Sequence, residues 1–176
     1  MAPNASFWLI SGDIVRHELK GFDNPVNEIQ HILWNVSHLI NENVNVPVVP
    51  ALGNNDVYPD YFLNLTDASP MLTTVALGWS PLGDINTTLV GHGGYMAKDV
   101  TDKLTVLSIN TVLYSMNRLL VDVSNTDPLG QFQWLQEQLD QARWSGRVVY
   151  IMGHIPPTVG SYRKTQLWLM SYLDTY

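Results

Sequence analysis

The sequence has no cysteine, no long apolar run and few basic residues among its 176 positions. Without cysteine, neither a disulfide framework nor a thiolate metal site can form. No stretch reaches the eighteen or more apolar residues of a membrane span. Lysine and arginine together number 9 against 16 acidic residues, so the formal net charge is −7. This balance disfavours nucleic-acid binding, and a polyanionic substrate would need metal ions or a local basic patch.

The first residues lack the marks of a signal peptide, because MAPNASFWLISGD has no basic region and its apolar stretch is short. We expect the chain to begin just before a core strand. Four Asn-x-Ser/Thr sequons favour a vacuolar or lysosomal lumen, or secretion, although an asparagine-rich chain also produces such triplets by chance. The acceptor residues are Asn4, Asn35, Asn64 and Asn86.

The apolar content of 45% supports a packed domain of the α/β class. The short apolar run 6–11 predicts a buried strand, and 46–52 predicts a second one. Between them, apolar residues recur at helical spacing from Pro25 onward and predict a helix of about four turns. A strand–helix–strand unit favours parallel strands with a right-handed crossover.

The second half of the chain predicts a hairpin, a helix and a further strand. Alternating residues in 93–111, with a polar turn at 101–103, indicate the hairpin. Asp127 and Pro128 predict the start of a helix that Gly146 ends, and an apolar strand follows at 147–153. Residues 57–92, rich in Pro, Asp, Asn and Gly, predict an insert or loop region with a short helix near 71–78. Another helix is expected to begin at residue 165.

Three predicted strands end in a glycine followed by a polar side chain: Asp13, Asn54 and His154. If the three strands are neighbours in one parallel sheet, these side chains meet at one edge. A carboxylate, an amide oxygen and an imidazole together can bind a hard or borderline divalent metal. Taken singly, each has a plainer explanation as a cap, a turn residue or a strand-end histidine. Their coincidence favours a functional site.

Two residues shortly after Asp13 extend this candidate site. His17 is a titratable group that could exchange protons near neutral pH, and Arg16 could clamp a phosphate through two hydrogen bonds. An exposed loop without catalytic function explains both residues equally well.

The blocks SGDIVRH (11–17), PALGNNDVYP (50–59) and YIMGHIPP (150–157) resemble the second, third and fourth blocks of calcineurin-like metallophosphoesterases. Within that superfamily the chain is similar to the branch that contains acid sphingomyelinase-like phosphodiesterases and endopolyphosphatases. LSINT and TDPLGQFQWL extend the similarity over most of the chain. The resemblance implies a metallophosphoesterase-type α/β fold, a layered β-sheet sandwich with flanking helices.

The resemblance also implies two divalent ions, of Zn, Mn, Fe or Co, about 3.5–4 Å apart. Asp13 would bridge them, while Asn54 and His154 would bind the second ion. Many relatives carry a histidine at the position of Asn55, where it helps to protonate the leaving group. An amide cannot do this, and we therefore hypothesise that His17 is the general acid. Asn55 and Asp56 are expected at the rim and in the turn, with Asp56 orienting its neighbours.

The family pattern includes two further blocks that this chain does not contain. An Asp-x-His block is expected before Phe7, and a Gly-His-x-His or Gly-His-x-Asn block after Tyr176. We therefore expect the central portion of the domain, without its first and last strands. The leading hypothesis is a hydrolase of phosphoanhydride or phosphoester bonds, most like an endopolyphosphatase acting on polyphosphate. The alternatives are a sphingomyelinase-like phosphodiesterase acting on lipid head groups or nucleotides, and an inactive fragment or pseudoenzyme that serves as a binding module.

Overall fold

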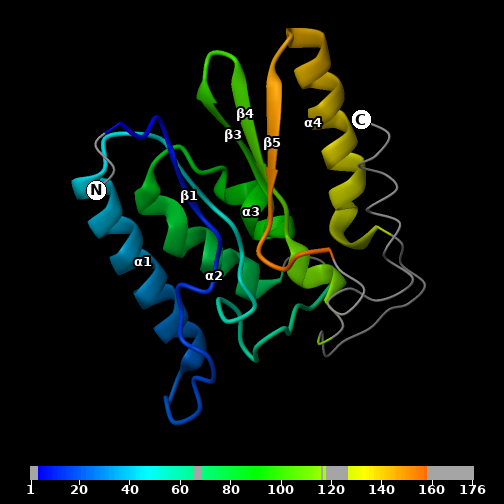
Figure 1. Ribbon diagram of the computed structural model, residues 1–176. Coiled ribbons are helices and arrows are strands. Elements are labelled where there is room, and N and C mark those ends of the chain that lie inside the picture. Colours follow the sequence, from blue (N-terminus) through cyan, green and yellow to red (C-terminus); the bar gives the residue numbers. More distant parts are fainter. Residues whose placement is uncertain (1–3, 66–68, 116, 118–126, 158–176) are drawn as a thin grey trace.

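The first sheet of this α/β chain is a parallel pair of strands joined by a long helix (Figure 1). Strand β1 (Trp8–Ile10) pairs with β2 (Val48–Pro50), and helix α1 (Pro25–Asn43) connects them. The predicted parallel strand–helix–strand unit is therefore confirmed. The computed structural model describes residues 4–65, 69–115, 117 and 127–157.

The second sheet has three strands in the order β3-β4-β5. β3 (Met96–Thr101) and β4 (Leu104–Ser108) form the predicted antiparallel hairpin, and β5 (Val148–Met152) lies parallel to β4. The condition that all three site-bearing strands are neighbours in one parallel sheet is not met, because β1 and β2 form one sheet while β5 belongs to the other and pairs with β4. The two sheets still meet, since the Ser108 hydroxyl donates to the carbonyl of Pro50 at 2.7 Å.

Helix α1 begins where the sequence places its start signals. The side chain of Asn24 accepts a hydrogen bond from the amide of Asn27 at 3.1 Å, and Pro25 occupies the first turn, where its missing N–H costs nothing. Ile29 and Leu33 lie on the inner face and are fully buried. This face packs α1 against the rest of the core and fixes the span between the ends of β1 and β2.

Residues 57–92 contain the predicted short helix near 71–78, but they have more helical structure than the expected insert or loop region. They contain α2 (Pro70–Trp79), a 3-10 turn η1 (Ser80–Leu82) and α3 (Thr87–Gly93). Helix α2 is buried on most of its circumference and packs closely on α1, where a Cβ on Gly78 would lie 2.6 Å from the Cβ of Leu33. A helix buried on most sides has little amphipathic periodicity, so its pattern resembles no surface helix.

Between β4 and β5, the described residues form three helical segments. These are η2 (Thr111–Tyr114), η3 (Pro128–Gly130) and α4 (Gln131–Ser145). Gly146 ends α4 in the left-handed conformation at a φ of 66°, as the sequence predicts. The helix expected from residue 165 lies outside the described residues. None of the helices in the described part of the chain is both long and apolar enough to cross a bilayer.

Candidate functional site

The loops that follow β1 and β2 touch through two glycines. A Cβ on Gly12 would lie 2.5 Å from the amide nitrogen of Gly53, and a Cβ on Gly53 would lie 2.1 Å from the amide nitrogen of Asp13. Gly12 also has a φ of 92°, which side chains other than glycine rarely adopt. The two glycines therefore permit the contact that brings Asp13 beside the Gly53–Asp56 turn.

A buried carboxylate ties the two loops together. Asp56 is fully buried, and its oxygens accept hydrogen bonds from the backbone amides of Asp13 at 2.9 Å, Gly53 at 2.9 Å and Val15 at 3.1 Å. Burial raises the pKa of Asp56, and the three amide hydrogen bonds oppose that rise. Asp56 thus orients its neighbours as expected, but from the interior of the turn and not from its rim.

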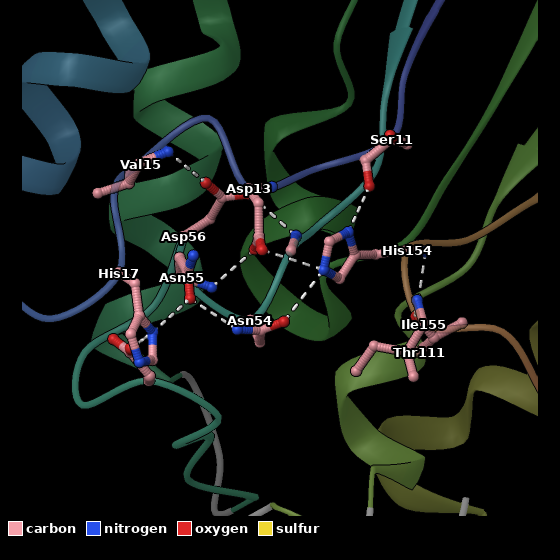
Figure 2. Close-up of polar contacts among 12 residues, drawn as sticks. Ser11, Asp13, Val15, His17, Asn54, Asn55, Asp56, Thr111, His154 and Ile155 are labelled. Carbon is pink, nitrogen blue, oxygen red and sulfur yellow. Dashed lines mark hydrogen bonds and ion pairs between the residues drawn. The ribbon is translucent and has the colours of Figure 1, made fainter. Parts of the chain in front are cut away.

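Asp13, Asn54 and His154 come together although their strands belong to two sheets (Figure 2). Nε2 of His154 lies 3.0 Å from Oδ1 of Asn54 and 3.3 Å from Oδ2 of Asp13. The other oxygen of Asp13 accepts a hydrogen bond from the amide of Asn55 at 2.9 Å, which fixes the carboxylate. These three residues, Asp13, Asn54 and His154, form the strand-end cluster.

The hydrogen-bonding character of the strand-end cluster suits a cation. Nδ1 of His154 lies 2.7 Å from the carbonyl oxygen of Ser11, which can only accept, so Nδ1 carries the hydrogen. In the neutral ring, Nε2 then presents a lone pair toward the oxygens of Asp13 and Asn54. Separations of 3.0 and 3.3 Å agree with the roughly 3.0–3.4 Å expected between ligands about 2.1 Å from a zinc-like ion. The residues present therefore fit a divalent metal.

The backbone that carries His154 is held by a threonine from η2. Oγ1 of Thr111 accepts hydrogen bonds from the amides of His154 at 3.2 Å and Ile155 at 2.8 Å. A Cβ on Gly153 would lie 2.5 Å from the methyl group of Thr111, so glycine is required for this approach. Sequence reasoning did not single out Thr111, although it lies in the LSINT segment that supports the family resemblance.

His17, the hypothesised general acid, and Asn55, which occupies the position of the family's histidine, lie beside the strand-end cluster and contact one another. Nδ1 of His17 lies 3.1 Å from Oδ1 of Asn55, and it also contacts the carboxylate of Asp60. Asn55 in turn accepts a hydrogen bond from Nδ2 of Asn54 at 2.6 Å. The contact with Asp60 was not predicted, because nothing in the sequence marks this aspartate apart from its nearness to the GNND turn.

Arg16 lies in the same loop as His17 but is exposed. Its guanidinium sits over the ring of Phe22, 5.3 Å from the ring centroid, in the geometry of a cation–π contact. Arg16, the predicted phosphate clamp, is therefore close to Asp13 in sequence, but in the structure its guanidinium stacks on Phe22.

The strand-end cluster contains two residues of the types that most often bind metals and one asparagine. Within residues 4–65, 69–115, 117 and 127–157, no group of three or more His, Cys, Asp or Glu side chains is arranged to hold an ion. The third donor atom is the amide oxygen of Asn54, a ligand type that hard cations accept. The described residues thus supply three donors for one ion, with Asp13 as the one expected to be shared by a second.

Polar donors gathered at the ends of strands, on a scaffold of two sheets with helices packed against them, are the features of an α/β protein with a candidate metal site. Residues 2–172 match the calcineurin-like phosphoesterase family, and the chain belongs to this family. Members typically use divalent metals, which agrees with the donor set of the strand-end cluster. The resemblance drawn from the three sequence blocks is therefore confirmed.

Similar proteins belong to both halves of the expected branch. The chain is 33% identical over 174 residues to "Sphingomyelinase phosphodiesterase D" of Dictyostelium discoideum, covering 98% of this chain and 38% of the relative. It is 34% identical over 170 residues to an endopolyphosphatase of Schizosaccharomyces pombe, covering 89% and 28%. It is 32% identical over 161 residues to "Cyclic GMP-AMP phosphodiesterase SMPDL3A" of Mus musculus, covering 86% and 34%. The chain thus spans less than two-fifths of the length of each of these relatives.

Proposed function

We propose that this chain forms the strand-end part of the active site of a metal-dependent hydrolase of phosphoanhydride or phosphoester bonds, most like an endopolyphosphatase. One observation carries the proposal: in the neutral His154 ring, the lone pair of Nε2 faces Oδ1 of Asn54 at 3.0 Å and Oδ2 of Asp13 at 3.3 Å, so that three acceptors converge. Such a cluster is stabilised by a cation. Membership in the calcineurin-like phosphoesterase family supports the same chemistry.

The residues around the strand-end cluster have distinct roles in this proposal. A divalent ion would supply positive charge to a phosphoryl oxygen and acidify an attacking water. Asp13, Asn54 and His154 would hold the ion, with Asp13 reaching toward a second one. His17 would give a proton to the leaving oxygen, because the amide of Asn55 has no proton to give at neutral pH.

Polyphosphate as the substrate faces one electrostatic obstacle and is supported by Arg16 and by one of the similar proteins. The net charge of −7 would repel a polyanion unless metal ions and Arg16 reverse the local field. Arg16 could leave its stacked position on Phe22 and bind a phosphate through two hydrogen bonds. The similarity to an endopolyphosphatase over 89% of the chain agrees with this choice.

A sphingomyelinase-like phosphodiesterase is the second candidate. The specific observation in its favour is coverage, because the similarity to the Dictyostelium discoideum phosphodiesterase extends over 98% of the chain. In that case Arg16 and the metal site would receive a lipid or nucleotide diester and not an anhydride. Hydrolysis of a diester in preference to polyphosphate would select this candidate.

A vacuolar, lysosomal or secreted glycoprotein is the proposed setting. The acceptor asparagines of the four sequons, Asn4, Asn35, Asn64 and Asn86, are all exposed. The oxygen of the Asn86 side chain caps α3 by accepting from the amide of Leu89 at 3.0 Å, which leaves its nitrogen for a glycan. A mass shift after enzymatic deglycosylation of the protein from its native source would test this setting.

The experiment that tests the proposed function measures bound metal and turnover together. Elemental analysis of this chain gives the metal per protein, while polyphosphate and bis-p-nitrophenyl phosphate serve as substrates. Bound metal with turnover that is lost in Asp13→Asn, and kept in the exposed Asp23→Asn, supports the proposal. A chain that binds no metal and hydrolyses neither substrate would instead be an inactive fragment or a binding module.

A further inference from the structure

We propose that Asp60 is a positioning residue: it fixes the ring of His17 and, through Asn55, the orientation of the Asn54 amide. Its importance for catalysis rests on the function proposed above. The nitrogen of His17 that carries the hydrogen can be identified by NMR, even if the chain has no enzymatic activity.

The carboxylate of Asp60 is in place before any substrate arrives. Its side chain is only 15% exposed, whereas that of His17 is 65% exposed. It accepts a hydrogen bond from the amide of Glu18 at 3.3 Å and contacts Nδ1 of His17. Asp60 therefore bridges two consecutive residues of the loop that follows β1 and holds His17 against the turn that follows β2.

The contact with Asp60 decides which nitrogen of His17 carries the hydrogen in the neutral ring. A carboxylate oxygen only accepts hydrogen bonds, so Nδ1 must be the donor. Asn55 agrees with this assignment, because the atom it places 3.1 Å from Nδ1 is its carbonyl oxygen. Nε2 is then the nitrogen that His17 can offer to a substrate, and in the imidazolium form it would hold the proton to be transferred.

The same assignment passes on to the strand-end cluster. Once the oxygen of Asn55 faces His17, the group that approaches it at 2.6 Å from Asn54 must be the donor Nδ2. The oxygen of Asn54 is consequently turned the other way, toward Nε2 of His154 at 3.0 Å. The orientation of each side-chain amide is thus fixed by the residue it contacts, and the series of hydrogen bonds starts at the carboxylate of Asp60.

The opposite end of this series of contacts has an independent anchor. The carbonyl of Ser11 fixes the hydrogen of His154 on Nδ1, so Nε2 also arrives at the cluster as an acceptor. Two fixed acceptors, the Asp60 carboxylate and the Ser11 carbonyl, therefore determine that Asn54 and His154 meet with lone pairs facing each other. In this account Asp60, which does not itself contact the cluster, helps to make it a cation site.

The first test is the tautomer of His17, read by nitrogen NMR of the 15N-histidine-labelled chain. The chain has 5 histidines, so the ring signals can be assigned with single His→Gln variants. We expect His17 to carry its hydrogen on Nδ1 when neutral. Asp60→Asn should shift the population toward the Nε2–H form. Asp23→Asn should not, because Asp23 is an exposed aspartate that lies in the same loop as His17 but does not contact its ring in the structure. A wild-type His17 in the Nε2–H form overturns the proposal even if Asp60→Asn does not fold.

The second test measures the binding of Zn²⁺ by titration calorimetry. Loss of an outer partner of metal ligands typically weakens binding by about 10–100-fold, which we expect for Asp60→Asn. Asp60→Glu, which keeps an accepting carboxylate, should restore part of the loss. Unchanged zinc affinity in Asp60→Asn would refute the link to Asn54. Absence of zinc binding in the wild-type chain would instead count against the proposed function, and the tautomer of His17 would still decide the role of Asp60.

Discussion

Two polar clusters in this protein are built on opposite hydrogen-bonding rules. The first, the Asn110–Gln131 cluster, consists of Asn110, Gln131 and Tyr114. Each of the following contacts pairs a donor with an acceptor. The amide of Asn110 donates to Oε1 of Gln131 at 2.6 Å, Nε2 of Gln131 donates to the hydroxyl of Tyr114 at 2.6 Å, and Nδ2 of Asn110 donates to the carbonyl of Gly93 at 2.9 Å. In the strand-end cluster, by contrast, acceptors face acceptors when the ring of His154 is neutral.

The difference in hydrogen bonding distinguishes side chains that stabilise the fold from side chains that are arranged to bind a ligand. Asn110, Gln131 and Tyr114 are buried, and their mutual hydrogen bonds offset the cost of removing them from water. The strand-end cluster lies at the surface side of the same fold and gains nothing comparable until a cation or a proton enters it. Mutations in the first cluster should therefore change stability, and mutations in the second should change ligand binding.

The largest expected effect comes from Asp13→Asn in the strand-end cluster. The substitution removes a charged ligand and can place an amide donor near Nε2 of His154, which lies 3.3 Å from Oδ2 of Asp13. Zinc affinity should fall by more than about 100-fold, beyond what the loss of an outer partner usually costs. Without metal, the free energy of unfolding should stay constant or rise, because an acceptor pair becomes a hydrogen bond. Urea unfolding with and without Zn²⁺ measures both quantities.

Asp23→Asn is the matched control for that variant, since it makes the same chemical change at an exposed position. Its zinc affinity and stability should equal those of the wild type. A metal-free Asp13→Asn protein that is clearly less stable than wild type would contradict the comparison, because Asp13 would then belong with the stabilising groups.

Gln131→Leu tests the other cluster and should have the opposite outcome. Leucine fills a similar volume but cannot accept from the buried amide of Asn110, so the free energy of unfolding should fall by about 2–3 kcal/mol. Zinc affinity of the folded chain should change little. Gln133→Leu is the control, because Gln133 is an exposed residue of the same helix. Equal losses in the two variants, measured by urea unfolding, would show that the buried network is not what stabilises α4.

Thr111 lies between the two clusters, and Thr111→Val should lower zinc affinity by less than Asp13→Asn does. Thr111 follows Asn110 in sequence and accepts from the amides of His154 and Ile155. Valine keeps the shape of the side chain but removes this acceptor, so the loop that carries His154 should loosen. Zinc affinity should fall by about 10–100-fold, and Thr111→Ser should retain most of it. Equal affinities of Val and Ser variants in calorimetry would exclude a role for the hydroxyl.

The sequence predicted the parts of the fold whose signals are local. Pro25 and Gly146 mark helix ends because their backbone preferences are intrinsic, and the hairpin at 93–111 follows from alternating residues and a polar turn. The strand ends at Asp13, Asn54 and His154 were also predictable, since each follows a glycine after an apolar run. Their meeting was expected for the wrong topological reason, because the three strands lie in two sheets.

The parts that sequence reasoning missed depend on contacts between distant residues. Helix α2 was expected near 71–78, but only as a short helix within a loop region, because α1 and α3 cover most of its surface and its periodicity is weak. Thr111 and Asp60 contact residues 43 positions away: Thr111 accepts from the amide of His154, and Asp60 contacts the ring of His17. No local preference distinguishes such a threonine or aspartate from an ordinary loop residue. Only the close approach of Gly12, Gly53 and Gly153 to other chain segments leaves a sequence trace of this packing.

The smallest expected effect is an alkaline loss of stability at Tyr95, beside the stabilising cluster. Its hydroxyl donates to the carbonyl of Leu129 at 2.7 Å, and burial, with Asp127 and Glu137, raises its pKa to about 12. Because the pKa in the unfolded chain is about 10, the stability from this group is complete below that value and is lost as the pH rises toward about 12.

The free energy of unfolding of wild type relative to Tyr95→Phe should therefore decrease by about 1 kcal/mol between about pH 9 and pH 11. Tyr150→Phe, at a half-exposed tyrosine of β5, is the control and should show a much smaller change. Urea unfolding at several pH values in the presence of a chelator makes the measurement independent of the strand-end cluster. A pH dependence equal in the two variants would place the alkaline titration elsewhere, and Tyr95 would then stabilise the fold through its packing on Trp134 alone.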